Sequence, residues 1–161
     1  MAGHIVYVHT IVPASPQAVW DVITDVGSAD RVFRSVDGSR RLGSGPFGVG
    51  TAWQQRRTVF GHHGTEELRV VECEAPRLLV VETRLGHDVV RTSYRLSEIG
   101  ENGGRTRVAA TTILRTDDRT PLERFAWDNF GEGRYERTHK MLERDLEDIA
   151  AEVGRRARVA V

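Results

Sequence analysis

The sequence is poor in cysteine and has no long apolar run, and each shortage excludes a class of protein. Cys73 is the only cysteine, so an intrachain disulfide and a cysteine-based zinc cluster are both excluded. No apolar run approaches the ~20 residues of a membrane-spanning helix, so we expect no membrane insertion. The first residues lack the basic region, apolar core and cleavage site of a signal peptide, which predicts a cytoplasmic location.

The charges of the chain balance, with 23 basic and 23 acidic residues. A neutral chain has no overall field to attract nucleic acid or anionic lipid, so we predict no nucleic-acid partner. All of the basic residues except Lys140 are arginine, which indicates the coding bias of a GC-rich bacterial genome. The length of 161 residues suits one domain, and no repeat or linker marks a second, so we predict a single domain over residues 1–161.

The first part of the chain alternates in the manner of strands, apart from two short helices. β-Branched and aromatic residues over Ile5–Val12 predict a strand. Ser15 and Pro16 are typical of a helix N-cap and first turn, and we expect this helix to end near Gly27 and a second to cover 29–34. Further strands are predicted over Val36–Leu42, Thr51–Phe60, Glu66–Cys73, Leu78–Leu85, Val89–Ile99 and Thr106–Thr116.

The strands are separated by turns and not by helices, and the last part of the chain is helical. Asn102-Gly103 between two alternating runs is a strong hairpin signal, so the sheet should be antiparallel and the fold class α+β. An amphipathic helix is predicted to begin within about three residues of Pro121, with a tail that frays from Arg155. Its apolar stripe consists of Leu122, Phe125, Phe130, Leu142, Leu146, Ile149 and Val153.

Three segments carry a family resemblance. They are the run Ile11–Asp25 with its Val-Trp pair, the glycine-rich Gly43–Trp53, and Val70–Leu78, in which an acidic residue and a proline join two strands. Together they resemble the START-like, helix-grip superfamily, which includes the SRPBCC proteins and the polyketide cyclase/dehydrase and lipid-transport group. One departure is Val32-Phe33-Arg34, where many relatives carry a Trp-Pro pair after the first helix.

The resemblance implies a START-like or Bet v 1-like fold, in which a curved, seven-stranded antiparallel sheet surrounds a long C-terminal helix. It also implies an internal cavity that binds a small hydrophobic molecule of aromatic, polyketide or lipid-like character. The alternative function is a cofactor-independent polyketide cyclase, aromatase or dehydratase acting on a poly-β-carbonyl chain by acid/base chemistry and conformational control. No cofactor is expected, and the question of a homodimer stays open.

Strand alternation predicts which side chains face the cavity. If the arginines of the last strands, such as Arg91, Arg95 and Arg107, point to solvent, their neighbours point inward. The predicted ligand-binding residues are Trp53, Gln55, Arg57, Val81, Thr83, Thr92, Tyr94, Ala110, Thr112 and, from the C-terminal helix, Phe130. The candidates for catalysis are Tyr94, Arg57 and His62, and no nucleophile motif accompanies them.

The polar candidates also have simpler interpretations. A buried Arg57 must meet an anion, which is either a ligand group or a salt bridge with Glu66 or Glu72, unless the side chain is exposed. His62-His63 suggests a base or a metal site, but no third ligand follows, so solvated turn residues are favoured and no metal is predicted. His87-Asp88 is interpreted as a turn, with an imidazole oriented by aspartate as the alternative.

The spacing Gly43-x-Gly45-x-x-Gly48 matches the dinucleotide-binding fingerprint. That fingerprint requires a turn from a strand into a helix, where backbone N–H groups face the pyrophosphate. Pro46 lies inside the match and a strand follows it, so no helix N-terminus is available. We therefore interpret the glycines as a bent connection at the cavity mouth and predict no nucleotide cofactor.

Overall fold

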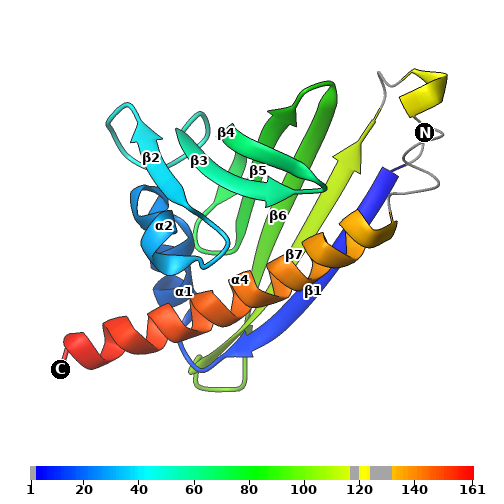
Figure 1. Ribbon diagram of the computed structural model, residues 1–161. Coiled ribbons are helices and arrows are strands. Elements are labelled where there is room, and N and C mark those ends of the chain that lie inside the picture. Colours follow the sequence, from blue (N-terminus) through cyan, green and yellow to red (C-terminus); the bar gives the residue numbers. More distant parts are fainter. Residues whose placement is uncertain (1–2, 117–119, 124–131) are drawn as a thin grey trace.

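The computed structural model describes residues 3–116, 120–123 and 132–161 (Figure 1). The aromatic residues Phe125 and Phe130 of the predicted stripe lie outside these ranges. Seven strands form one antiparallel sheet in the order β1-β7-β6-β5-β4-β3-β2. Their bounds are β1 (Gly3–Val12), β2 (Gly38–Leu42), β3 (Ala52–Val59), β4 (His62–Glu74), β5 (Leu78–Leu85), β6 (Asp88–Ile99) and β7 (Arg105–Arg115).

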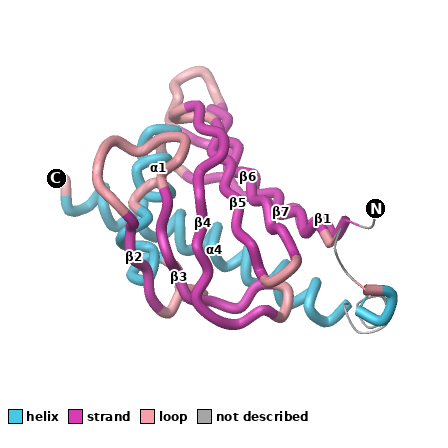
Figure 2. Tube along the Cα trace, turned by 90° about the horizontal axis from the view of Figure 1, so that it is seen from above, coloured by secondary structure: helices cyan, strands magenta, loops and turns pink. Residues whose placement is uncertain are grey.

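The helices lie on one side of this sheet, and the helix-grip fold predicted from the sequence is confirmed. Between β1 and β2 the chain forms α1 (Pro16–Ile23), the 3-10 helix η1 (Val26–Ser28) and α2 (Ala29–Val32). The long helix α4 (Glu132–Val159) crosses the concave face of the sheet (Figure 1). Figure 2 shows the same helix from above, with the strands curving around it. None of the described helices is long and apolar enough to cross a membrane.

Helix α1 begins as the sequence predicts and ends earlier. The Ser15 hydroxyl accepts a hydrogen bond from the Ala18 N–H at 3.3 Å, and Pro16 occupies the first turn. The helix ends at Ile23 and not near Gly27, and the Thr24 hydroxyl donates to the Trp20 carbonyl at 2.8 Å. The early end lets the chain turn through η1 and α2, which together cover one end of the concave face.

The predicted inward faces of the strands agree with the structure. Thr92 and Thr112 lie opposite each other on β6 and β7 and are both buried, whereas Arg95 between the inward positions is exposed. Strand β4 begins at His62, four residues before the predicted start at Glu66. The connection from β3 is tight because Phe60 and Gly61 both adopt positive φ, so the two histidines belong to a strand and not to a loop.

Of the predicted apolar stripe, the described residues on the C-terminal helix α4 pack against the sheet as expected, whereas Leu122 does not. Leu142, Leu146, Ile149 and Val153 are all buried in the core. Leu122 is 77% exposed, so its assignment to the stripe is wrong. Residues 121–123 form a helical turn that lies apart from the sheet in Figure 1.

The predicted fraying from Arg155 is also wrong, because α4 continues to Val159. Glu152 accepts hydrogen bonds from Arg155 at 2.6 Å and Arg156 at 2.7 Å. Arg156 also binds Asp25 at 2.8 Å, which ties the last turns of α4 to the segment after α1. Hydrogen bonds from Arg155 lower the pKa of Glu152 to about 2.

Replacing Glu152 by glutamine should therefore lower the free energy of unfolding by about 1–2 kcal/mol at neutral pH. A lowered pKa means that the stabilisation is complete above the unfolded pKa of 4.5 and is lost as the pH falls toward about 2. Urea unfolding of wild type and variant should converge over that range. The control is Glu147→Gln, because the ion pair of Glu147 with Arg34 joins side chains that are 70% and 61% exposed and should contribute far less to stability. An equal effect of both variants would contradict the prediction.

Candidate internal site

A small cavity lies between the sheet, α4 and the segment from α1 to the start of β2. Its volume is about 50 Å³. Residues Val22 to Val36 form one wall, named here the wall segment, and inward side chains of β3 to β6 form the other. The apolar lining consists of Val22, Ile23, Val26, Ala29, Phe33, Val36, Trp53, Leu68, Leu79 and Val81, and the polar lining of Asp25, Gln55, Arg57, Thr92, Tyr94 and Asp145.

A buried ion pair lies at the polar end of this cavity. The Arg57 guanidinium from β3 donates through Nη1 to Oδ2 of Asp145 on α4 at 2.8 Å, and the side chains are only 10% and 2% exposed. The other carboxylate oxygen of Asp145 accepts from the Ser35 hydroxyl at 2.6 Å. Asp145 therefore binds both the buried Arg57 guanidinium and Ser35 of the wall segment.

The network continues along β3 and β4. Arg57 Nε lies 3.5 Å from Oε1 of Glu66, within ion-pair range, although this nitrogen has no hydrogen-bond partner. The same Glu66 oxygen accepts from the Gln55 amide at 2.8 Å, and Gln55 accepts from the Trp53 indole at 3.2 Å. One guanidinium thus faces two buried carboxylates, so the cluster carries one more negative than positive charge when both are ionised.

Burial and charge shift the pKa values in this cluster. Burial raises the pKa of Asp145, and the nearby Arg57 charge only partly opposes this. Burial and the Asp145 carboxylate raise the pKa of Tyr94 to about 12, so its hydroxyl keeps its proton at neutral pH. Burial would lower the pKa of Arg57, but Asp145 and Glu66 outweigh it and raise the value. The cavity thus holds a fixed cation, a Tyr94 hydroxyl that keeps its proton, and the Asp145 carboxyl group, whose pKa is raised.

The threonines predicted to face a ligand lie mainly elsewhere. Thr83 and Thr112 line a second, smaller cavity of about 10 Å³, and Thr92 contributes to both cavities. The hydroxyls of Thr92 and Thr112 are 2.9 Å apart, and Thr83 donates to the Glu67 carbonyl at 2.6 Å. These hydrogen bonds join neighbouring strands and occupy the hydroxyls.

The other predicted residues divide into two groups. Trp53, Gln55, Arg57, Val81 and Tyr94 line the larger cavity together with Thr92. Ala110 is buried between Val8 and Tyr94 in neighbouring strands and lines neither of these two cavities, so its part in ligand binding stays a prediction. Strands β1 and β7 lie where side chains fill the space beneath α4. Phe130 lies outside the described residues.

His62 does not belong to the internal site. Its Nε2 lies 3.1 Å from Oδ2 of the buried Asp88, so the pair joins the β3–β4 turn to the start of β6. The predicted His-Asp arrangement therefore exists, but its imidazole comes from His62 and not from His87. His63 contacts Thr58 at 2.7 Å. Among the described residues no group of three or more histidine, cysteine or acidic side chains is arranged to hold a metal ion.

The structure tests the two simpler interpretations of Arg57, exposure and a salt bridge with Glu66 or Glu72. Its buried side chain excludes simple exposure, and Glu72 instead lies 3.7 Å from Arg91 on the outer face. The partner that sequence reasoning missed is Asp145. The sequence gives one indication that Asp145 is buried. It lies three residues after Leu142 and one before Leu146, so it adjoins the apolar stripe of the helix.

Comparison with known proteins identifies the family. The model of the family described as "Polyketide cyclase / dehydrase and lipid transport" matches residues 4–153. The chain belongs to this family. No curated protein matches the sequence.

Solved structures share the fold at low sequence identity. The Zhui aromatase/cyclase from a Streptomyces species superposes with a TM-score of 0.69 at 20% identity, covering 99% of this chain and 98% of that one. A START superfamily protein from Mycobacterium smegmatis gives 0.70 at 13% identity, covering 94% and 98%. A norcoclaurine synthase point mutant from Thalictrum gives 0.70 at 12% identity, covering 97% of both chains. At these identities the likeness establishes the fold alone.

Proposed function

We propose that this protein binds a small, largely apolar molecule carrying a carbonyl or hydroxyl group, between the sheet and α4. The observation that carries the proposal is an apolar cavity with polar groups at one end whose hydrogen-bonding capacity is incompletely used. Arg57 Nε has no hydrogen-bond partner, and the Tyr94 hydroxyl has none among the described residues. Buried polar groups normally have partners, and an acceptor oxygen of a ligand would supply one.

The size of the cavity requires the protein to open when it binds. About 50 Å³ is well below the ~300 Å³ at which small-molecule sites begin. The wall segment is the part suited to move, because η1 and α2 are only three and four residues long. Its attachments to α4 are polar: the Arg34 N–H and guanidinium bind Asp148 at 2.9 and 2.7 Å, beside the bond from Ser35 to Asp145.

Titration with tetralone, a neutral bicyclic ketone, should quench the fluorescence of Trp53 and raise the melting temperature. At a hundred times its dissociation constant, a ligand stabilises the folded state by about 2.7 kcal/mol. Replacing Tyr94 by phenylalanine removes one donor and should weaken binding by about 0.5–1.5 kcal/mol. Absence of any quenching or melting shift with apolar ketones, alcohols and fatty acids would reject the proposal.

A second function, acid/base catalysis on a carbonyl substrate, is favoured by the position of Asp145. Its ionised carboxylate could take a proton from the carbon next to a ketone, while Arg57 stabilises the resulting enolate oxygen. The test is exchange of that proton for deuterium in a bound β-diketone, followed by NMR in deuterium oxide. Asp145→Asn should abolish exchange and leave binding within about threefold. Exchange that continues unchanged in this variant would exclude Asp145 as the base and leave the binding function standing.

A further inference from the structure

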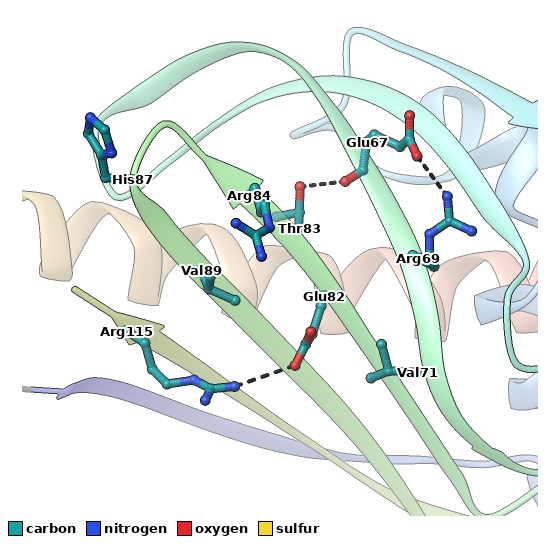
Figure 3. A pocket seen from close by; sticks show the side chains of 9 residues that line it. All are labelled: Glu67, Arg69, Val71, Glu82, Thr83, Arg84, His87, Val89 and Arg115. Atoms are coloured by element: carbon teal, nitrogen blue, oxygen red, sulfur yellow. Dashed lines mark hydrogen bonds and ion pairs between the residues drawn. The ribbon is translucent and has the colours of Figure 1, made fainter. Parts of the chain in front are cut away.

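The outer face of the sheet carries a hollow that is larger than the internal cavity. Its volume is about 600 Å³, within the range of ordinary small-molecule sites. Figure 3 shows the nine side chains that line it, from β4, β5, β6, the β5–β6 turn and the end of β7; except for Thr83, those on the strands belong to the face turned away from α4. We call this the outer hollow. It is separated from the internal site by the thickness of the sheet.

The centre of the outer hollow is a row of three residues from neighbouring strands. Arg84 on β5 lies opposite Val89 on β6, and Val89 lies opposite Arg115 on β7. Adjacent strands are ~4.8 Å apart, so the backbones of the two arginines are separated by about 10 Å, with a short apolar side chain between them. A carboxylate or small planar anion placed over Val89 would lie between two guanidinium groups.

The charges of the hollow favour an anion. Its lining contains three arginines, two glutamates and His87. Glu82 is shared between Arg91 at 3.1 Å and Arg115 at 3.5 Å, so one carboxylate serves two cations. Arg84 makes no ion pair with any described residue. Among the described residues, Arg84 has no counter-ion and Arg115 shares its counter-ion with Arg91, so the Val89 row carries positive charge although the chain as a whole is neutral.

The floor of the hollow adds an apolar component. Val71 and Val89 both line it, and both are only partly buried, although their β-branched side chains suit a strand. Val71 lies at a register shift between Val70 and Glu72 in the pairing of β4 with β5. Such an irregularity bends a strand locally. A ligand with an apolar ring would cover these valines while its charged group meets the arginines.

We propose that the outer hollow binds a small organic anion, an aromatic carboxylate or similar, with its charge between Arg84 and Arg115 and its ring over Val89. A planar guanidinium fork suits a carboxylate better than an ammonium would. Binding here is independent of the internal site and of the function proposed for it. Because the hollow is open to solvent, the affinity should fall as salt is added.

The experiment is titration of the protein with naphthoate at low ionic strength, followed by amide NMR. Saturable shifts are expected at Arg84, Val89 and Arg115. Arg84→Gln should weaken binding about tenfold, the value of one charge-assisted hydrogen bond. The matched control is Arg95→Gln, an exposed arginine on the same face of β6 that is not part of the lining. This control should leave the affinity unchanged.

Two further ligands test the parts of the proposal. Naphthol has the same rings without the charge, and inorganic phosphate has charge without rings, so each should bind the outer hollow at least about tenfold more weakly than naphthoate. Equal weakening by Arg84→Gln and Arg95→Gln, or shifts that do not saturate, would overturn the proposal. Naphthoate shifts confined to Phe33, Trp53 and Tyr94 would also overturn it while supporting the internal site. Shifts at the hollow alone would support it even if the internal site binds nothing.

Discussion

Replacing Arg57 by methionine should lower the free energy of unfolding by about 3–5 kcal/mol, the largest effect expected of a single substitution in this protein. The replacement leaves Asp145 and Glu66 buried without their shared cation. An uncompensated buried carboxylate costs far more than the loss of a hydrogen bond. Urea unfolding at neutral pH, monitored by circular dichroism, measures the change.

The loss should depend on pH in a defined direction. Without Arg57 the folded-state pKa of Asp145 should rise further, because burial is no longer opposed by a positive charge. A carboxyl group whose pKa is raised in the folded state is most stabilising below its unfolded pKa and loses that stability as the pH rises. The variant should therefore be closest to wild type near pH 4 and fall behind it toward pH 7. A pH-independent difference would contradict the buried-charge explanation.

Replacing all three charged residues of the cluster by neutral ones tests whether the cluster is needed for ligand binding, apart from its effect on stability. In the triple variant Arg57→Met, Glu66→Gln and Asp145→Asn no buried charge remains, so stability should return to within about 2 kcal/mol of wild type. If the charged cluster serves a ligand, this variant should be folded and yet bind tetralone about tenfold more weakly or not at all. Full affinity in the triple variant would show that the cluster has no part in ligand binding.

Replacing Thr92 by tryptophan should reduce binding of an apolar ligand at least about a hundredfold. Thr92 lies on β6 between the two internal cavities, and a side chain of that size would fill both. A hundredfold loss corresponds to about 2.8 kcal/mol of binding free energy, and the overpacking itself should lower the stability of the fold by roughly 1–3 kcal/mol. Isothermal titration with tetralone measures the affinity, and thermal unfolding shows whether the variant is folded.

The control for this prediction is Ser97→Trp. Ser97 lies on the same strand but on the outer face and is exposed, so its replacement adds the same bulk away from the cavity. Affinity within about twofold of wild type is expected for it. Equal losses in the two variants, or an unaffected Thr92→Trp protein, would mean that the ligand does not occupy the cavity.

The inward positions of the sheet could be predicted from the sequence because side-chain direction in a strand is a local property. Successive residues point to opposite faces, so one outward arginine fixes its neighbours. This reasoning placed Trp53, Gln55 and Arg57 on the inside correctly. Ala110 shows its limit: the same alternation predicted that it faces inward, but not that packed side chains fill the space in front of it.

The contacts that define the site were decided only by the tertiary structure. Arg57 and Asp145 are 88 residues apart, and their ion pair depends on where α4 crosses the sheet and on which turn of the helix faces β3. The pairing of His62 with Asp88 depends in the same way on two hairpins meeting at one end of the sheet. The periods of two and 3.6 residues determined the elements and their faces, since both follow from backbone geometry within a few residues. The size of the cavity, the partner of each buried charge and the row formed by Arg84, Val89 and Arg115 follow from how distant segments are placed against one another, which no local period encodes.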